Sequence, residues 1–171
     1  MKLIPLLSLG LGALALSAHA ESKVSDAQIA AIVVTANQVD VDAGQLAQDK
    51  ATDPAVKQFA STMVTDHTAV NKSAVALVTK LKVTPQDNET SRALKAGGEK
   101  NLTDLRKLNG HAFDQAYVDH EVDYHEQVIA AIDDVLIPSA ENAELKALLI
   151  KVRPAFVEHL AHARHLQAAL K

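Results

Sequence analysis

Cysteine and tryptophan are absent from this 171-residue sequence, and aromatic residues make up only 3% of it. Without cysteine the chain can form neither a disulfide nor a thiolate metal site. Its 21 acidic residues outnumber its 17 basic residues and no basic cluster occurs, so nucleic acid is not an expected partner. Scarce aromatic residues and abundant alanine favour closely packed helices over a β-sheet.

The first 20 residues have the pattern of a secretory signal peptide. Lys2 precedes an apolar run, Leu3–Leu16, and the small residues of Ser17-Ala18-His19-Ala20 form a cleavage site. The alternative is a membrane anchor. The apolar run is short for a membrane span, and no basic flank follows it, so the pattern favours the signal peptide. No cysteine follows for attachment of a lipid, and no later apolar stretch approaches the length of a membrane span. We therefore expect cleavage after residue 20 and one exported domain, residues 21–171, without a transmembrane segment.

The stretch from Pro54 to Leu81 has the clearest helical pattern in the chain. Its apolar positions recur in alternating steps of four and three residues, which places them on one face of a helix. They are Val56, Ala60, Met63, Val70, Ala74, Leu77 and Leu81. His67 occupies the one polar position in this stripe. With Asp53 as N-cap and Pro54 as first residue, the helix would extend roughly 40 Å and needs partner helices to bury the stripe.

A first helix is predicted ahead of this one. Ser25, followed by Gln28 at the third helical position, is an N-terminal capping signal, and the pattern continues to about Lys50. The connection Ala51-Thr52 is very short, so the first two helices are expected to be antiparallel neighbours. After the second helix, residues 89–108 have a weaker pattern that Gly97-Gly98 interrupts, which predicts a short, broken crossover helix.

Two further long helices are predicted in the C-terminal half. The first spans about residues 112–136 and is ended by Pro138, after which Ser139 can cap the next. The last helix spans about residues 140–170, and Pro154 should kink or split it. The expected fold is therefore all-α, a ferritin-like up-down four-helix bundle with a short broken crossover helix.

Five polar side chains stand where these helices should present apolar ones. They are Asp40, His67, Glu121, His125 and His159. A buried charge or imidazole without a partner is costly, so these groups must pair with one another or bind something. Imidazoles and carboxylates on facing helices are how bundles hold metal ions, which predicts a site for a divalent transition metal such as Zn, Cu or Fe. Glu121 and His125, four residues apart, share one helix face.

The alternative is a buried hydrogen-bond network that sets helix register without an ion, in which Tyr117 could take part. Register also limits the metal hypothesis. Counted from Pro138, His125 and His159 differ in level by roughly 10 Å, which places His159 nearer Tyr117 and Glu121 than His125. His162 and His165 extend the row of His159 along the last helix and could join a site or simply face solvent.

Motifs of known enzymes are missing. Di-iron carboxylate bundles use a Glu-x-x-His pair on two helices, whereas Glu121 and His125 are one residue too far apart and Glu158 is adjacent to His159. No zinc-protease, serine-hydrolase or phosphate-loop motif occurs. A metalloenzyme is therefore a weaker hypothesis than a non-enzymatic metal-binding protein or a structural or interaction protein.

Several segments together resemble the DUF4142 family, uncharacterised proteins of the bacterial cell envelope that are often labelled putative outer membrane proteins. The matching pieces are Val56-Lys-Gln-Phe-Ala60, Met63-Val-Thr-Asp-His67, Gly110-His-Ala-Phe-Asp114, Tyr117, His125 and Arg153-Pro-Ala-Phe-Val-Glu-His159. The resemblance implies a periplasmic four-helix bundle of ferritin-like architecture and no established activity. The family's typical glutamate in the first helix appears here as Asp40, whose side chain has a shorter reach.

Overall fold

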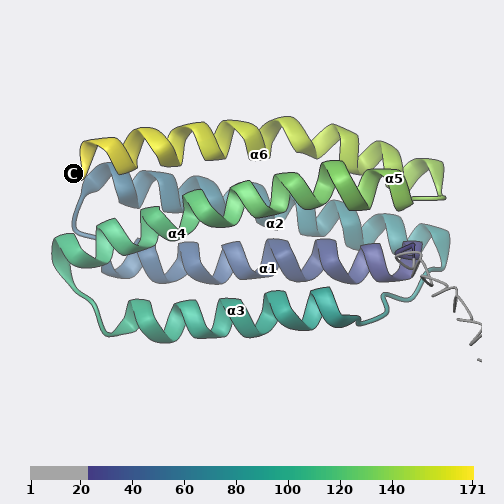
Figure 1. The fold of residues 1–171 in the computed structure, drawn as a ribbon, viewed down its shortest axis with the longest axis horizontal. Helices are drawn as coiled ribbons and strands as arrows, with labels where there is room; N and C mark the ends of the chain where they lie inside the picture. Colours follow the sequence, from purple (N-terminus) through teal and green to yellow (C-terminus); the bar gives the residue numbers. More distant parts are fainter. Residues whose placement is uncertain (1–22) are drawn as a thin grey trace, which may run out of the picture.

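A computed structural model describes residues 23–171 as an all-α bundle whose long helices run alternately in opposite directions along one axis (Figure 1). They are α1 (Asp26–Lys50), α2 (Pro54–Leu81), α3 (Glu89–Arg106), α4 (Gly110–Ala131) and α6 (Ala143–Ala169). The predicted fold class is confirmed. No helix in this part of the chain is long and apolar enough to cross a membrane. The predicted signal peptide, residues 1–20, lies outside the described residues.

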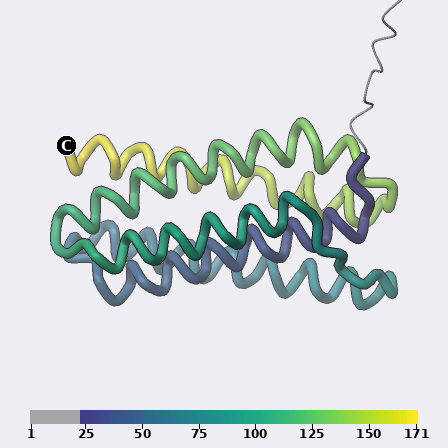
Figure 2. Tube along the Cα trace, turned by 60° about the horizontal axis from the view of Figure 1, so that its bottom comes forward, coloured from purple at the N-terminus to yellow at the C-terminus, as the bar shows by residue number. Residues whose placement is uncertain are grey.

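Helices α1 and α2 form one antiparallel hairpin, and α4 and α6 form the other. Helix α3 and the loops on either side of it connect the hairpins by running back along the bundle, and α3 packs mainly on α1 (Figures 1 and 2). As a result α2 and α4 point the same way. A single long crossover between two helix hairpins is the connectivity of ferritin-like bundles.

The predicted starts of α1 and α2 are confirmed, and a buried carboxylate stabilises the turn between them. Ser25 caps α1 in a capping box with Gln28, and the Asp53 carboxylate caps α2. At the turn between them the buried Asp114 of α4 accepts hydrogen bonds from the Thr52 amide and hydroxyl and from the Asp53 amide. Asp114 therefore ties the two hairpins together at this end and has a structural role.

The prediction of a short broken crossover helix is wrong, because α3 is one continuous helix of 18 residues. Gly98 is buried where α3 crosses Val39 of α1, and a Cβ atom at position 98 would lie 2.7 Å from Val39 Cγ2. Gly97 is exposed and has no such neighbour. The glycine pair thus permits close approach of α3 to α1 instead of ending the helix.

Gly98→Ala is expected to lower the free energy of unfolding by about 1–3 kcal/mol, because the added methyl group overpacks the contact with Val39. Gly97→Ala is the matched control. It should raise stability by up to about 1 kcal/mol, because alanine favours the helix and no neighbour is displaced. Urea unfolding of the two variants measures both effects. Similar changes in both would mean that α3 does not pack through Gly98.

The end of the second hairpin also differs from prediction. Helix α4 continues through a π turn, η1 (Ile132–Leu136), into the short α5 (Ile137–Ser139), which contains Pro138. Asn142, not Ser139, caps α6, and its side chain accepts from the amides at positions 144 and 145. Helix α6 continues unbroken through Pro154, which is exposed, so the helix is not split there.

The apolar interior has two parts, separated by a layer of polar side chains. One apolar cluster lies toward the α1–α2 turn and includes Phe59, Phe113 and Leu166. The other lies toward the α4–α6 turn and includes Ile32 and Leu149. Between them each of the four bundle helices contributes buried polar residues. These residues, here called the polar layer, are Asp40, His67, Glu121, His125 and His159.

Candidate metal centre

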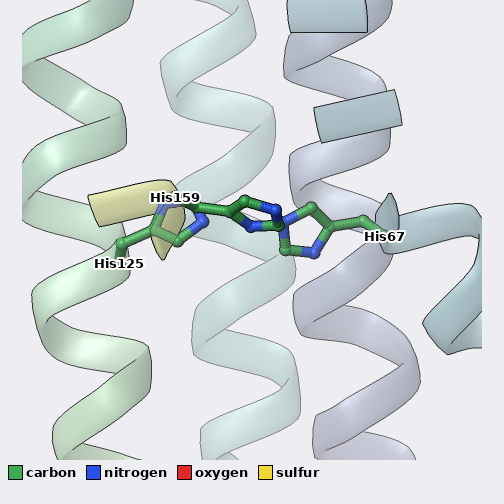
Figure 3. A group of neighbouring side chains, drawn as sticks. All are labelled: His67, His125 and His159. Carbon is green, nitrogen blue, oxygen red and sulfur yellow. The ribbon is translucent and has the colours of Figure 1, made fainter. Parts of the chain in front are cut away.

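Three imidazoles from three helices converge in the polar layer. His67 of α2, His125 of α4 and His159 of α6 are all buried, and one ring nitrogen of each lies within 4.8 Å of the others (Figure 3). The ring centroids are 5.2–5.5 Å apart. Each position sits on the buried face of its helix, so packing of the apolar stripes directs the rings toward one point.

The outer nitrogens of two of these rings are fixed by hydrogen bonds. The Asn37 side-chain amide donates to a backbone carbonyl, so its oxygen faces His67 and accepts from His67 Nδ1 at 2.9 Å. Asp40 Oδ2 lies 3.3 Å from the same nitrogen. His125 Nδ1 donates to the backbone carbonyl of Glu121 at 2.9 Å. In both rings the proton is therefore on Nδ1 and Nε2 carries a free lone pair.

The third ring has the opposite tautomer. His159 Nε2 lies 2.9 Å from the Asp66 carboxylate, which only accepts when ionised, so the proton is on Nε2 and the lone pair on Nδ1. Among the described residues no hydrogen-bond partner exists for His67 Nε2, His125 Nε2 or His159 Nδ1. Three lone pairs without a proton between them cannot hydrogen-bond to one another. Metal-binding histidines have this arrangement, in which the outer nitrogen donates to a carboxylate or carbonyl.

Burial keeps the imidazoles of His67 and His125 neutral. It lowers the pKa of His67 well below its usual range, and the neighbouring His125 and His159 lower it further. Burial also lowers the pKa of His125 to about 4. Protonation would put positive charge into an apolar interior. The rings of His67 and His125 are therefore in the state that binds a metal ion at neutral pH.

Two buried carboxylates adjoin the histidines. Asp40, Glu121 and His125 form a second group whose possible ligand atoms lie within 4.8 Å of one another. Both Glu121 carboxylate oxygens and the Tyr117 hydroxyl are buried without a hydrogen-bond partner in the described chain. Burial raises the pKa of Glu121 to about 8, and burial together with Glu121 raises that of Asp40. A bound cation would supply the positive charge that this pair lacks.

The structure therefore brings together all five residues singled out from the sequence, but one expectation about them is wrong. His125 and His159 are not offset by 10 Å, since their ring centroids are 5.5 Å apart. The turn between α4 and α6 is centred near Glu141, three residues beyond Pro138, because the helix continues through η1 and α5. This moves His125 away from the turn and His159 toward it, which removes most of the expected offset.

Comparison with known proteins identifies the family. The family model described as a domain of unknown function (DUF4142) matches residues 12–166. The chain belongs to the DUF4142 family. No curated protein and no solved structure matches it. The chemistry of this DUF4142 protein has therefore to be argued from its own residues.

The other histidines within the described part of this DUF4142 chain take no part in the polar layer. His162 is exposed and lies edge-on to the Phe59 ring, and His165 is exposed. Two functional side chains were missed in the sequence, Asn37 and Asp66. Asn37 precedes Asp40 by three residues on the buried face of α1, and Asp66 directly precedes His67. Their hydrogen bonds join different helices, and sequence spacing carries no sign of such contacts.

Proposed function

We propose that this protein binds one divalent transition-metal ion through His67, His125 and His159, with Asp40 and Glu121 as carboxylate ligands or as neighbours that balance its charge. The observation that carries the proposal is the set of three inward nitrogens. Each is buried, has no proton and no hydrogen-bond partner within residues 23–171, and belongs to a ring fixed from outside by a hydrogen bond. A network that only sets helix register would place a donor opposite one of these lone pairs.

The ligand types favour some ions over others. Three imidazole nitrogens with a carboxylate oxygen suit Zn, Cu or Fe, whereas Mg and Ca prefer shells of oxygen ligands. The Glu-x-x-His pairs of di-iron bundles are missing, since Val64 and Phe156 stand three residues before His67 and His159. We therefore propose a non-enzymatic metal-binding role in the cell envelope.

We propose further that the protein acts in the periplasm after cleavage of residues 1–20. The support is the charged start, short apolar run and small-residue cleavage site of the sequence. N-terminal sequencing of protein from the periplasmic fraction should begin at Glu21. Full-length protein in the membrane fraction would instead indicate an uncleaved anchor.

Elemental analysis of untagged protein from periplasm tests the metal proposal, together with thermal melts with and without Zn, Cu, Fe and Mn. A polyhistidine tag would bind these ions itself. We expect near-stoichiometric metal and a higher melting temperature. An ion that binds only the native state stabilises it by about 2.7 kcal/mol at 100 times its Kd. Protein without metal, whose melting temperature no ion changes, would support the hydrogen-bond network and a structural or interaction role.

A further inference from the structure

A cavity of about 210 Å³ lies in the apolar half of the bundle toward the α4–α6 turn. Residues of α1, α2, α3, α4, η1 and α6 line it, and none of them is charged. Its walls are mostly aliphatic, with Val33 from α1 and Leu149 and Val152 from α6. Native interiors are close-packed and leave few voids larger than a water molecule. A cavity of this size is therefore a candidate binding site.

The buried polar side chains in the cavity wall, Asn37 and Tyr124, already have partners. The Asn37 amide group is paired with Val33 and His67, and the Tyr124 hydroxyl donates to the Ala36 carbonyl at 3.0 Å. Water needs two to four polar partners to stay in a buried site, and apolar cavities remain dry or take apolar molecules. An ionised ligand would find no opposite charge in the wall. The occupant that fits is neutral and apolar.

The volume of the cavity and its aromatic wall residues narrow the class of ligand further. An engineered apolar protein cavity of about 150 Å³ binds benzene, so 210 Å³ accommodates one ring with a small substituent. The rings of Tyr124 and Phe156 form part of the wall and offer aromatic edges and faces to such a ring. Thr90 and Gln127 are exposed lining residues on α3 and α4, which places the entrance between these two helices.

The cavity and the three histidines share a wall. The Phe156 ring lines the cavity and lies edge-on to His67, with centroids 5.0 Å apart, and its centroid is 6.0 Å from that of His125. Asn37 also lines the cavity and holds His67 by its hydrogen bond. We propose that this cavity binds a neutral single-ring aromatic molecule next to the polar layer. The proposal goes beyond metal binding and does not depend on it.

Titration of the metal-free protein with toluene, followed by methyl NMR and thermal melts, tests this site. We expect saturable shifts of the methyl signals of Val33, Leu149 and Val152 and a melting temperature raised by a few degrees. Benzoate has the same ring with a negative charge and should produce neither effect. Absence of toluene shifts, or equal shifts with benzoate, would overturn the proposal.

A variant whose larger side chain fills the cavity tests where toluene binds, and it can be compared with a matched control variant. Ala131 lines the cavity at the end of α4, so Ala131→Leu should weaken toluene binding at least tenfold. Ala96→Leu adds the same side chain on the exposed face of α3, away from the cavity, and should leave binding unchanged. If Ala131→Leu lacks a cooperative melt, Val152→Phe fills the cavity from α6 instead. A filled, folded variant that binds toluene as well as the wild type would overturn the assignment.

Measuring zinc uptake alongside toluene binding distinguishes failure of the cavity proposal from failure of the metal-binding proposal. Toluene binding by metal-free protein that takes up no zinc would support the cavity and refute the metal site. Zinc uptake without any toluene shift would support the metal site and refute the cavity proposal.

Discussion

His67→Ala is expected to abolish stoichiometric metal uptake. The change removes one of three imidazole ligands at the centre of the polar layer, and two imidazoles bind an ion far less tightly, by at least about 100-fold on the scale of changes around metal sites. Elemental analysis should find the variant metal-free, and zinc should no longer raise its melting temperature. Stoichiometric metal in this variant would show that the ion, if any, binds elsewhere.

A matched control separates loss of the ligand from loss of a histidine in general. His162→Ala removes an exposed imidazole on α6 that packs in a T-shaped pair with the Phe59 ring and lies outside the polar layer. Metal uptake by this variant should therefore be unchanged. Metal-free His67→Ala should also be less stable than metal-free wild type by about 1–3 kcal/mol, because Asn37 and Asp40 lose their buried partner. Circular dichroism at the assay temperature shows that the variant is folded when metal is measured.

Without metal, the free energy of unfolding is expected to fall as pH rises from about 6.5 to 8. Folded Glu121 keeps its proton until its pKa of about 8, whereas in the unfolded chain it loses the proton near the ordinary glutamate pKa of 4.5. Between these two pKa values the free energy of unfolding falls by about 1.4 kcal/mol for each pH unit of increase, for each such proton. The raised pKa of Asp40 acts in the same direction.

The histidines confine this decline to the upper part of the window. His67 and His125 stay neutral in the folded state but take up protons when unfolded below about pH 6.5, so they lower stability as pH falls. Above pH 6.5 that opposing effect fades, and it is nearly gone about one pH unit higher. Urea unfolding at half-unit steps from pH 6.5 to 8 should show the decline in wild type and a shallower slope in Glu121→Gln. Glu99→Gln, at an exposed position on α3, should retain the wild-type slope. Parallel profiles for all three proteins would mean that Glu121 does not hold a proton in the core.

Local signals in the sequence predicted much of this structure correctly. Capping at Ser25 and Asp53 and the apolar stripe of α2 depend on neighbouring residues alone, so they could be recognised without the fold. The same stripe marked His67 as a polar exception, and similar exceptions on three other helices identified the five polar residues as candidates for a shared site.

Other features depend on contacts between helices and were not predictable from spacing. Gly97-Gly98 suggested a broken helix because the sequence alone does not distinguish a glycine that ends a helix from one that permits close packing. The structure shows that Gly98 packs closely against Val39. The level of His159 was misjudged because Pro138 was taken as the turn, whereas a π turn carries the helix past it. Asn37 and Asp66 have roles that exist only once α1, α2 and α6 are assembled.

Division of the apolar interior by the polar layer has a consequence for how the bundle unfolds. Phe113 and Leu149 belong to different apolar clusters, so truncations at the two positions act on separate contacts and their costs should add. Ile129 packs against both clusters, and the five polar side chains lie between the remaining parts of the two clusters. An ion held in the polar layer would therefore couple the two ends more closely during unfolding, and its removal would make it easier for one end to open before the other.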